Sequence, residues 1–203
     1  MYEEQEKLYR QCKDLYNRND YINGLNIINK IVDDYNHNNN ELFYEDKIDN
    51  LIEFLNKNIK NNIGKEKAYK CKYSFCFFMA CSKYKLYKYK EALEYYNIAI
   101  SEYEKSNYNN NYYIILHSSK ANTLQILGQY DEAIKEYDKV INNMDIKESK
   151  YDVFNNKGYC LQKLGKWEEA LKTYNDSIKA INDCKNYEAY CYRTILLEKY
   201  DLP

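Results

Sequence analysis

The chain lacks a long apolar run. Its longest, from Ser74 to Cys81, is far too short to cross a bilayer, which takes about 20 apolar residues. The first ten residues, MYEEQEKLYR, are charged throughout and lack the apolar core of a signal peptide. We therefore expect a cytoplasmic, intracellular protein that has no membrane-spanning segment and no membrane partner.

An excess of one charge and a glycine-rich loop are also missing. Thirty basic and 31 acidic side chains give a formal net charge of -1, and the two signs alternate along the sequence. Nucleic-acid-binding proteins usually carry a basic face, so we expect no nucleic-acid partner. The five glycines are isolated from one another, which excludes a phosphate-binding loop.

The seven cysteines suggest neither a disulfide framework nor a metal site. Their number is odd, and no C-x-x-C pair occurs. Cys71, Cys76 and Cys81 are spaced by five residues, which on a helix changes the direction of a side chain by about 140°. Three such side chains cannot converge on one ion, and the two histidines, His37 and His117, are far away in the sequence. We expect no metal and no other cofactor.

What the chain does contain is an internal repeat. Four segments carry an aromatic residue at the first position and apolar or small residues at offsets of about 3, 4, 7, 10 and 11, which is one face of an α-helix. A second helical pattern precedes two of them, over residues 114–127 and 151–164, and a glycine turn follows each at Gly128 and Gly165. The unit is therefore helix, tight turn, helix. The four segments start at Tyr21, Tyr89, Tyr130 and Trp167.

Small residues recur at fixed positions of this unit. They let the two helices of a pair approach closely, and large rings such as Tyr137 and Tyr174 fill the space toward the next pair. One pair cannot bury both of its faces, so neighbouring pairs must stack. The recurring sets are Ala80, Ala92 and Ala99; Ala121, Ala133 and Val140; and Gly158, Ala170 and Ser177.

These residues resemble the tetratricopeptide repeat (TPR) family. Residues 151–182 match its pattern well, and residues 114–145 match with His117 where an aromatic is usual. Residues 73–103 match less well, because Lys83 and Tyr87 replace a large apolar residue and a glycine. The match over 151–182 rests on Phe154, Gly158, Leu161, Gly165, Trp167, Ala170 and Tyr174.

The resemblance implies a single all-α domain over residues 1–203. We expect an α-solenoid of antiparallel helix pairs, a TPR-like right-handed superhelix, with a C-terminal capping helix. The expected repeats cover about 5–34, 73–104, 114–147 and 151–183. An irregular helical insert is expected at about 41–64 because one continuous apolar stripe occupies it, and the cap at about 186–200.

The same resemblance implies a protein–protein interaction scaffold that holds a peptide or protein segment along the concave side of the first helices. Amide side chains there can hydrogen-bond an extended backbone, and aromatic rings can anchor side chains. Carried over by position, the candidate groove residues are Phe77, Tyr84, Ser118, Asn122, Gln125, Asn155, Asn156, Tyr159 and Gln162.

Two alternatives remain open beside this non-enzymatic scaffold. Some relatives clamp the C-terminal carboxylates of chaperones with cations, but here Ser118, Glu188 and Tyr192 stand at those positions. The chain could thus be a chaperone-associated co-factor without the standard carboxylate clamp. The second alternative is a helical domain with an undetected enzymatic role, although His117 occupies the place of a buried aromatic. Self-association is also possible.

Overall fold

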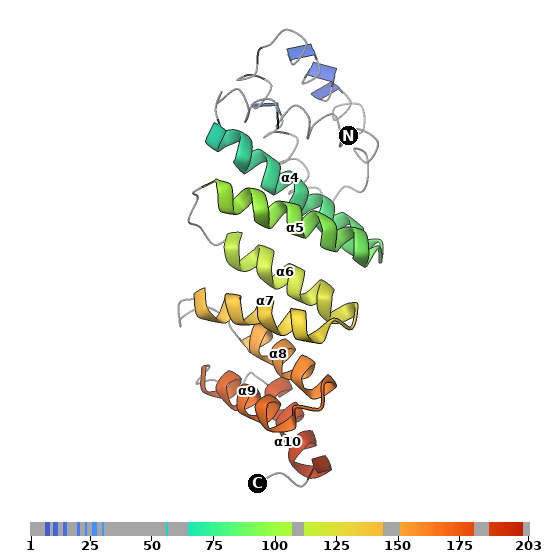
Figure 1. Ribbon diagram of the computed structural model, residues 1–203, viewed down its shortest axis with the longest axis vertical. Coiled ribbons are helices and arrows are strands. Elements are labelled where there is room, and N and C mark those ends of the chain that lie inside the picture. The colour runs from blue at the N-terminus through green and yellow to red at the C-terminus, as the bar shows by residue number, and fades with distance from the viewer. Residues whose placement is uncertain are drawn as a thin grey trace. The chain divides into compact units, whose positions relative to one another are not determined.

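The structure is a computed structural model that describes residues 65–106, 112–143, 151–180 and 187–200, with scattered single residues between 7 and 56. Every regular element in these ranges is a helix (Figure 1). The predicted all-α solenoid of antiparallel helix pairs with a final capping helix is confirmed. The helices are α4 (Lys65–Lys85), α5 (Tyr89–Lys105), α6 (Tyr112–Ile126), α7 (Tyr130–Asn143), α8 (Tyr151–Lys163), α9 (Trp167–Ala180) and α10 (Tyr187–Tyr200).

The chain divides into two compact units, residues 1–109 (unit 1) and 110–203 (unit 2). The first expected repeat, about 5–34, and the expected insert, about 41–64, lie almost wholly outside the described residues. The expectation of one domain over 1–203 therefore stays a prediction. None of the seven described helices has the length and apolar composition that a membrane crossing requires.

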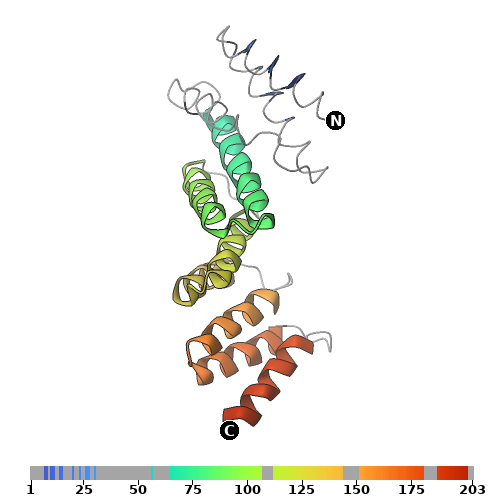
Figure 2. The same cartoon turned by 90° about the vertical axis from the view of Figure 1, so that its right-hand side faces the viewer.

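In unit 1, α4 and α5 form an antiparallel pair (Figure 2). Ala80, Ala92 and Tyr96 are the buried centre of their contact. Lys83, which stands at a usually apolar position, is also buried, and its ammonium group pairs with the Glu91 carboxylate at 2.9 Å. This ion pair explains how the repeat accommodates a lysine there, because a buried charge needs a partner of opposite sign.

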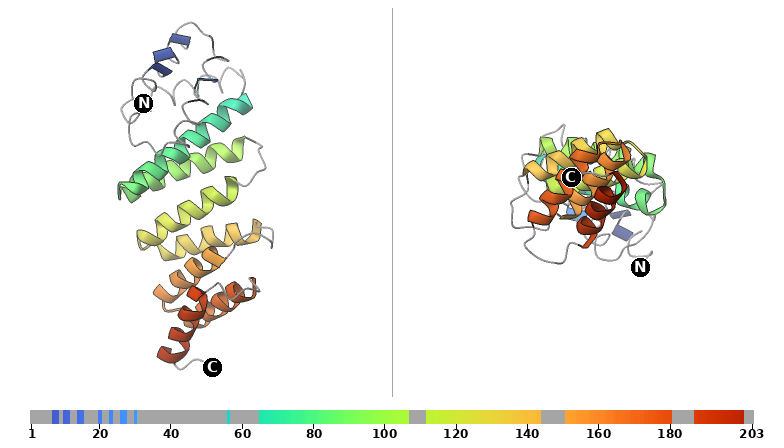
Figure 3. Two further views of the ribbon diagram at one scale, coloured as in Figure 1. Left: turned by 180° about the vertical axis from the view of Figure 1, so that it is seen from behind. Right: turned by 90° about the horizontal axis from the view of Figure 1, so that it is seen from below.

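Unit 2 contains the pairs α6–α7 and α8–α9, followed by α10 (Figure 3). Helix α8 packs on both α7 and α9, and α10 packs mainly on α9. The small residues predicted to lie at these contacts are completely buried, as Ala121, Ala133 and Ala170 show. On the inner side of α10, Tyr200 stacks on Trp167 with a centroid distance of 4.0 Å, and Tyr192 stacks on Tyr174 at 5.4 Å.

The turns inside the three pairs share one backbone conformation. Gly128 and Gly165 both have φ 75°, and Tyr87 takes φ 61° at the same place. In each turn the amide of the next residue donates back to the carbonyl five residues earlier, with the same N–O distance of 2.9 Å. This is the hydrogen bond of a Schellman cap, which needs a left-handed residue.

Replacing Tyr87 by glycine should therefore stabilise the α4–α5 pair. A left-handed conformation costs a residue with a Cβ about 1–2 kcal/mol, and the exposed Tyr87 ring makes only an edge contact with Tyr89. We expect the free energy of unfolding to rise by about 1 kcal/mol in urea titrations. The reciprocal change, Gly128→Ala, should lower it by a similar amount, because a Cβ there meets no atom within 4 Å and only the backbone is strained. Equal stabilities of Tyr87→Gly and the natural chain would contradict this account.

Candidate functional site

One buried tyrosine in the second helix of each described pair sends its hydroxyl group toward the first helix. The Tyr137 hydroxyl lies 2.7 Å from Asn122 Oδ1 and 2.8 Å from Gln125 Oε1. The Tyr174 hydroxyl lies 3.4 Å from Gln162 Oε1, and that of Tyr96 lies 3.6 Å from the Cys81 sulfur. The rings thus fill the core, while their polar ends fix side chains of the first helices.

The contacts around Tyr137 join three helices into an amide cluster, defined here as Asn122, Gln125, Tyr137 and Asn156. Asn156 Nδ2 of α8 donates to Asn122 Oδ1 of α6 over 3.3 Å. The Cys160 thiol lies 3.6 Å from Gln125 Oε1. Asn122 is the centre of this arrangement because it contacts both α7 and α8.

The single hydrogen of the Tyr137 phenol decides how these amides are oriented. It can be donated to only one of its two neighbours, so the other must present its NH₂ group to the phenol oxygen. Flipping the Asn122 amide would place its NH₂ group against the NH₂ group of Asn156, which leaves two donors facing each other. Flipping the Gln125 amide loses only a weak hydrogen bond from the Cys160 thiol. We therefore assign Asn122 as the acceptor and Gln125 as the donor to Tyr137.

Eight of the nine candidate groove residues are partly exposed on first helices. Phe77 and Tyr84 belong to unit 1, where they pack against the core of the α4–α5 pair. The other six belong to α6 and α8 of unit 2, two helices that contact each other. They are Ser118, Asn122, Gln125, Asn156, Tyr159 and Gln162.

Asn155 lies inside the helix packing, which corrects its placement on the groove surface. Its side chain is only 3% exposed. The Ser177 hydroxyl, at the small-residue position of α9, donates to Asn155 Oδ1 over 2.8 Å. Asn155 Nδ2 lies 3.5 Å from a Glu188 oxygen of α10. The amide is thus satisfied within the protein and is not presented to a ligand.

The two ends of α8 differ in charge. At its beginning, burial and then the negative charge of Glu188 raise the pKa of the Asp152 carboxyl, so these two acids lie near each other. At its end, the Lys163 ammonium group sits 5.1 Å from the centre of the Tyr159 ring. Glu188 is one of the positions where a carboxylate clamp carries a cation, and here the local charge is negative.

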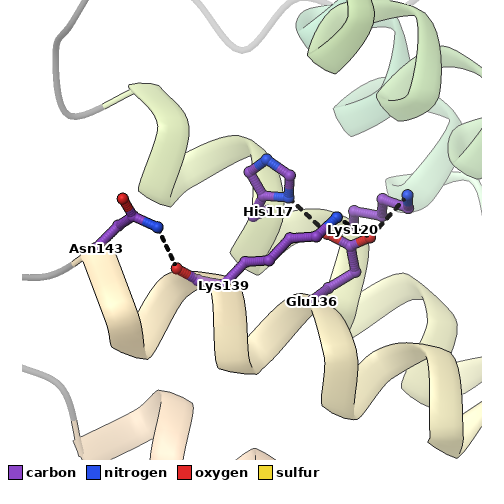
Figure 4. Close-up of polar contacts among 5 residues, drawn as sticks. All are labelled: His117, Lys120, Glu136, Lys139 and Asn143. Carbon is purple, nitrogen blue, oxygen red and sulfur yellow. Dashed lines mark hydrogen bonds and ion pairs between the residues drawn. The ribbon is translucent and has the colours of Figure 1, made fainter. Parts of the chain in front are cut away.

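A second polar cluster connects α6 to α7 below the surface (Figure 4). His117 Nδ1 contacts one Glu136 oxygen, and the ammonium groups of Lys120 and Lys139 lie 3.0 and 3.1 Å from the other. Burial alone raises the pKa of the Glu136 carboxyl. The hydrogen bonds from His117 and Lys120 and the charge of Lys120 outweigh it, so the pKa falls to about 2.

This cluster does not present a general base to a substrate. His117 is 1% exposed, its Nε2 atom is buried without a hydrogen-bond partner in the described part of the chain, and the Tyr113 ring lies 4.2 Å from the imidazole. A catalytic base must reach the proton that it removes. Within the same residues, no group of three or more His, Cys, Asp or Glu side chains could hold a metal ion.

The sequence reasoning missed two residues that shape this region. It treated Tyr137 only as a space-filling ring, although a tyrosine in all three pairs, where phenylalanine would fill the same space, was a visible signal for a hydroxyl role. It did not single out Glu136, because a lone carboxylate in a charged helix normally faces solvent.

Comparison with known proteins agrees with this architecture. The family model "Tetratricopeptide repeat" matches residues 116–143 and 151–184, which are the α6–α7 and α8–α9 pairs. No curated protein matches the chain by sequence.

Three solved structures show the same fold at low identity. The first TPR of Spaghetti (RPAP3), bound to the HSP90 peptide SRMEEVD, is 18% identical over 64% of this chain and 94% of that one, with a TM-score of 0.53. TPR-like repeats of a putative kinesin light chain from Podospora anserina are 10% identical over 97% of this chain and 91% of that one, with a TM-score of 0.51. The C-terminal part of a TPR protein from Cytophaga hutchinsonii is 13% identical over 95% of this chain and 71% of that one, with a TM-score of 0.50.

Proposed function

Because the chain belongs to the tetratricopeptide repeat family, we propose that it is a protein-interaction scaffold that holds an extended segment of another protein against α6 and α8. Tetratricopeptide repeats support a protein–protein interaction role. The finer assignment rests on one observation, the hydrogen-bonding capacity that the amide cluster retains after its internal contacts are made.

Asn122 and Asn156 together offer a free NH₂ group and, beside it, a free carbonyl oxygen. Asn122 Oδ1 accepts from both Tyr137 and Asn156, which uses its two lone-pair directions and leaves its NH₂ group without a partner among the described residues. Asn156 donates one hydrogen, and its carbonyl oxygen has no partner in the same part of the chain. One donor beside one acceptor matches the C=O and N–H groups of an extended backbone.

Apolar side chains flank this pair of amides along α6. Ile115 and Ile126 are 43% and 46% exposed, which is unusual for isoleucine. With Asn122 they follow spacings of seven and four residues, so all three lie on one side of the helix. Tyr159 adds an aromatic ring from α8. This α6–α8 face, defined as Ile115, Asn122, Ile126, Asn156 and Tyr159, combines backbone recognition with apolar anchors.

The charges favour this mode over capture of an acidic chaperone tail. A carboxylate clamp needs cations at its contact positions. At those positions this chain has Ser118 and Glu188, and Glu188 lies near a second acid, Asp152. A peptide ending in several carboxylates would meet repulsion there. The α6–α8 face itself carries no charged side chain, so binding to it should depend weakly on salt.

Partner capture by the full chain tests the proposal. We expect the pair Asn122→Ala and Asn156→Ala to weaken binding of the captured partner about tenfold or more, since two buried hydrogen bonds are lost. Tyr137→Phe removes the hydrogen bond that orients the Asn122 amide but keeps both amides, so it should weaken partner binding less. Asn142→Ala, an exposed amide on α7, is the matched control and should bind normally.

The readout is a binding isotherm at two salt concentrations, together with the side-chain NH₂ signal of Asn122 in NMR titration. A partner that binds the folded double variant as tightly as the natural chain would move the binding surface elsewhere. A large loss of affinity between low and high salt would equally exclude this uncharged face.

A further inference from the structure

The turn that joins α4 to α5 holds a bulky residue where the two turns of unit 2 hold glycine (Figure 2). Tyr87 takes φ 61° there, and its side chain is 79% exposed. A left-handed conformation is an outlier for a residue of this size, because its Cβ crowds the backbone. The ring pairs edge-on with Tyr89 at a centroid distance of 6.2 Å and contributes little to the core. Stability therefore does not account for this tyrosine, and strain of this kind is typical of functional positions.

The charges at this turn also differ from those at the other two. In unit 2 the second helix of each pair begins with two acids, which suit the positive end of the helix dipole. Helix α5 begins with Lys90 beside Glu91, and Lys88 precedes it. Both lysines are exposed, and neither belongs to an ion pair within the described residues. Glu91, the one acid among residues 82–93, is already paired with the buried Lys83 at 2.9 Å. The turn thus carries positive charge that helix stability disfavours.

Aromatic rings and cations alternate along the turn. The Tyr89 ring stands edge to face with both Tyr84 and Tyr87, at centroid distances of 5.3 and 6.2 Å. The three rings form one cluster, in which the Tyr87 ring is the most exposed and has at least one open face. We call this surface the lysine–tyrosine turn. It comprises Tyr84, Lys85, Tyr87, Lys88, Tyr89 and Lys90.

We propose that the lysine–tyrosine turn binds single-stranded nucleic acid. Proteins that bind single strands combine cations, which contact the phosphates, with aromatic side chains on which the bases stack. Here Tyr87 supplies the stacking ring, and Lys85, Lys88 and Lys90 supply the cations. The net charge of -1 predicted no nucleic-acid partner, but that sum conceals a local excess of lysine at one turn. This activity is separate from the proposed function, because the α6–α8 face belongs to unit 2 and carries no charged side chain.

Other anionic partners fit this surface less well. An acidic peptide would pair with the lysines but would leave the exposed Tyr87 ring unexplained. An anionic membrane surface is bound by a helix with a broad apolar face, whereas the aliphatic residue of this turn, Leu86, is partly buried. A duplex keeps its bases stacked inside and offers no free base to Tyr87. A single strand supplies both phosphates and unstacked bases.

Fluorescence anisotropy of a labelled single strand of about 12 nucleotides, titrated with the full chain at several salt concentrations, tests the proposal. With three lysines on phosphates, we expect a dissociation constant on the order of 10–100 µM at low salt and a log–log salt slope of about -2. Lys88→Gln with Lys90→Gln should reduce this slope to about -0.7. The matched control, Lys172→Gln with Lys179→Gln, removes two exposed lysines of α9 and should leave the slope unchanged.

The Tyr87→Gly variant separates binding from folding. It is expected to be more stable than the natural chain, so weaker binding cannot result from unfolding. It should bind the single strand about tenfold less tightly, because the stacking of one base is lost. Tyr87→Phe keeps the ring and should bind as the natural chain does, since stacking does not need the hydroxyl group.

Several results would overturn the proposal. They are no binding by the natural chain at about 1 mM, an unchanged affinity of Tyr87→Gly, and an unchanged salt slope of the double lysine variant. Tighter binding of a polyglutamate peptide or of phosphatidylserine vesicles would assign the turn to a different partner. Equal binding of a duplex would exclude base stacking. None of these results bears on the α6–α8 face, whose own variants test the proposed function.

Discussion

Replacing Gly158 by valine is expected to lower the free energy of unfolding of unit 2 by about 3 kcal/mol or more. A Cβ at this position would lie 2.5 Å from Cε1 and 2.7 Å from Cζ of the Tyr174 ring. Carbon atoms normally approach to about 3.5–4.0 Å. The ring is completely buried against Leu161, Ala170 and Leu196, so it cannot move without disturbing the contact with α10. Overpacking costs about 1–3 kcal/mol, and valine adds two methyl groups to the clash.

Urea unfolding, with hydrogen exchange of α8 and α9 as the local readout, measures this loss. A double-mutant cycle with Tyr174→Ala isolates the clash from the lower helix propensity of valine. If the ring is the obstacle, the double variant should lose at least about 1 kcal/mol less than the sum of the single changes. Additive losses would show that Gly158 is required for another reason.

Gly158 also illustrates what the sequence could predict. Gly158 occupies the repeat position that Ala80 and Ala121 occupy in the other two pairs. A small residue at this position in every pair indicated a close contact between helices, because only small residues permit one. Gly128 and Gly165 likewise indicated the ends of helices, and both adopt the left-handed conformation. Helix pairs are specified by local patterns of this kind, so the fold followed from the residues alone.

The candidate site was less predictable, because burial depends on partners from other helices. Helical periodicity assigned Asn155 and Asn156 to one surface, yet only Asn156 is partly exposed. Asn155 is buried because Ser177, a residue of α9, donates its hydroxyl hydrogen to Asn155 Oδ1 in the place of water. Helical periodicity does not tell which of two adjacent residues at the edge of a buried face points inward. A hydroxyl group on a neighbouring helix, which can hydrogen-bond only one of them, determines which residue is buried.

The side of α10 that faces away from α8 and α9 shows the same limit. The segment contains four charged residues, Glu188, Arg193, Glu198 and Lys199. They lie mostly toward the sides of the helix, while Tyr187, Tyr190 and Ile195 are exposed on its outer side. Counting charges in the segment therefore did not reveal which of its sides they occupy.

Glu136→Gln is expected to destabilise unit 2 by about 2–3 kcal/mol at neutral pH and by much less near pH 2. The ionised carboxylate accepts hydrogen bonds from His117, Lys120 and Lys139, and its own side chain is almost fully buried. A neutral amide keeps the shape but offers one oxygen to these donors and adds an NH₂ group that none of them can accept.

The pH dependence follows from the direction of the pKa shift. The pKa of the Glu136 carboxyl falls from its ordinary value of 4.5 to about 2 in the folded protein. A carboxyl group whose folded pKa lies below its unfolded pKa stabilises the protein fully above the unfolded value, here about 4.5. That contribution is lost as the pH falls through the folded value. A fall of the pKa from 4.5 to about 2 corresponds to roughly 3 kcal/mol, since a pKa difference of one is worth about 1.4 kcal/mol.

Urea unfolding of the natural chain and Glu136→Gln at pH 7, 4 and 2.5 measures this effect as a difference between the two proteins. Comparing them at each pH removes the contributions of the other acidic residues, because both chains share these. Glu94→Gln, at an exposed position in the middle of α5, is the control and should change stability by less than about 0.5 kcal/mol. A stability difference that stays constant from pH 7 to 2.5 would mean that packing alone, and not the charge of Glu136, holds α6 against α7.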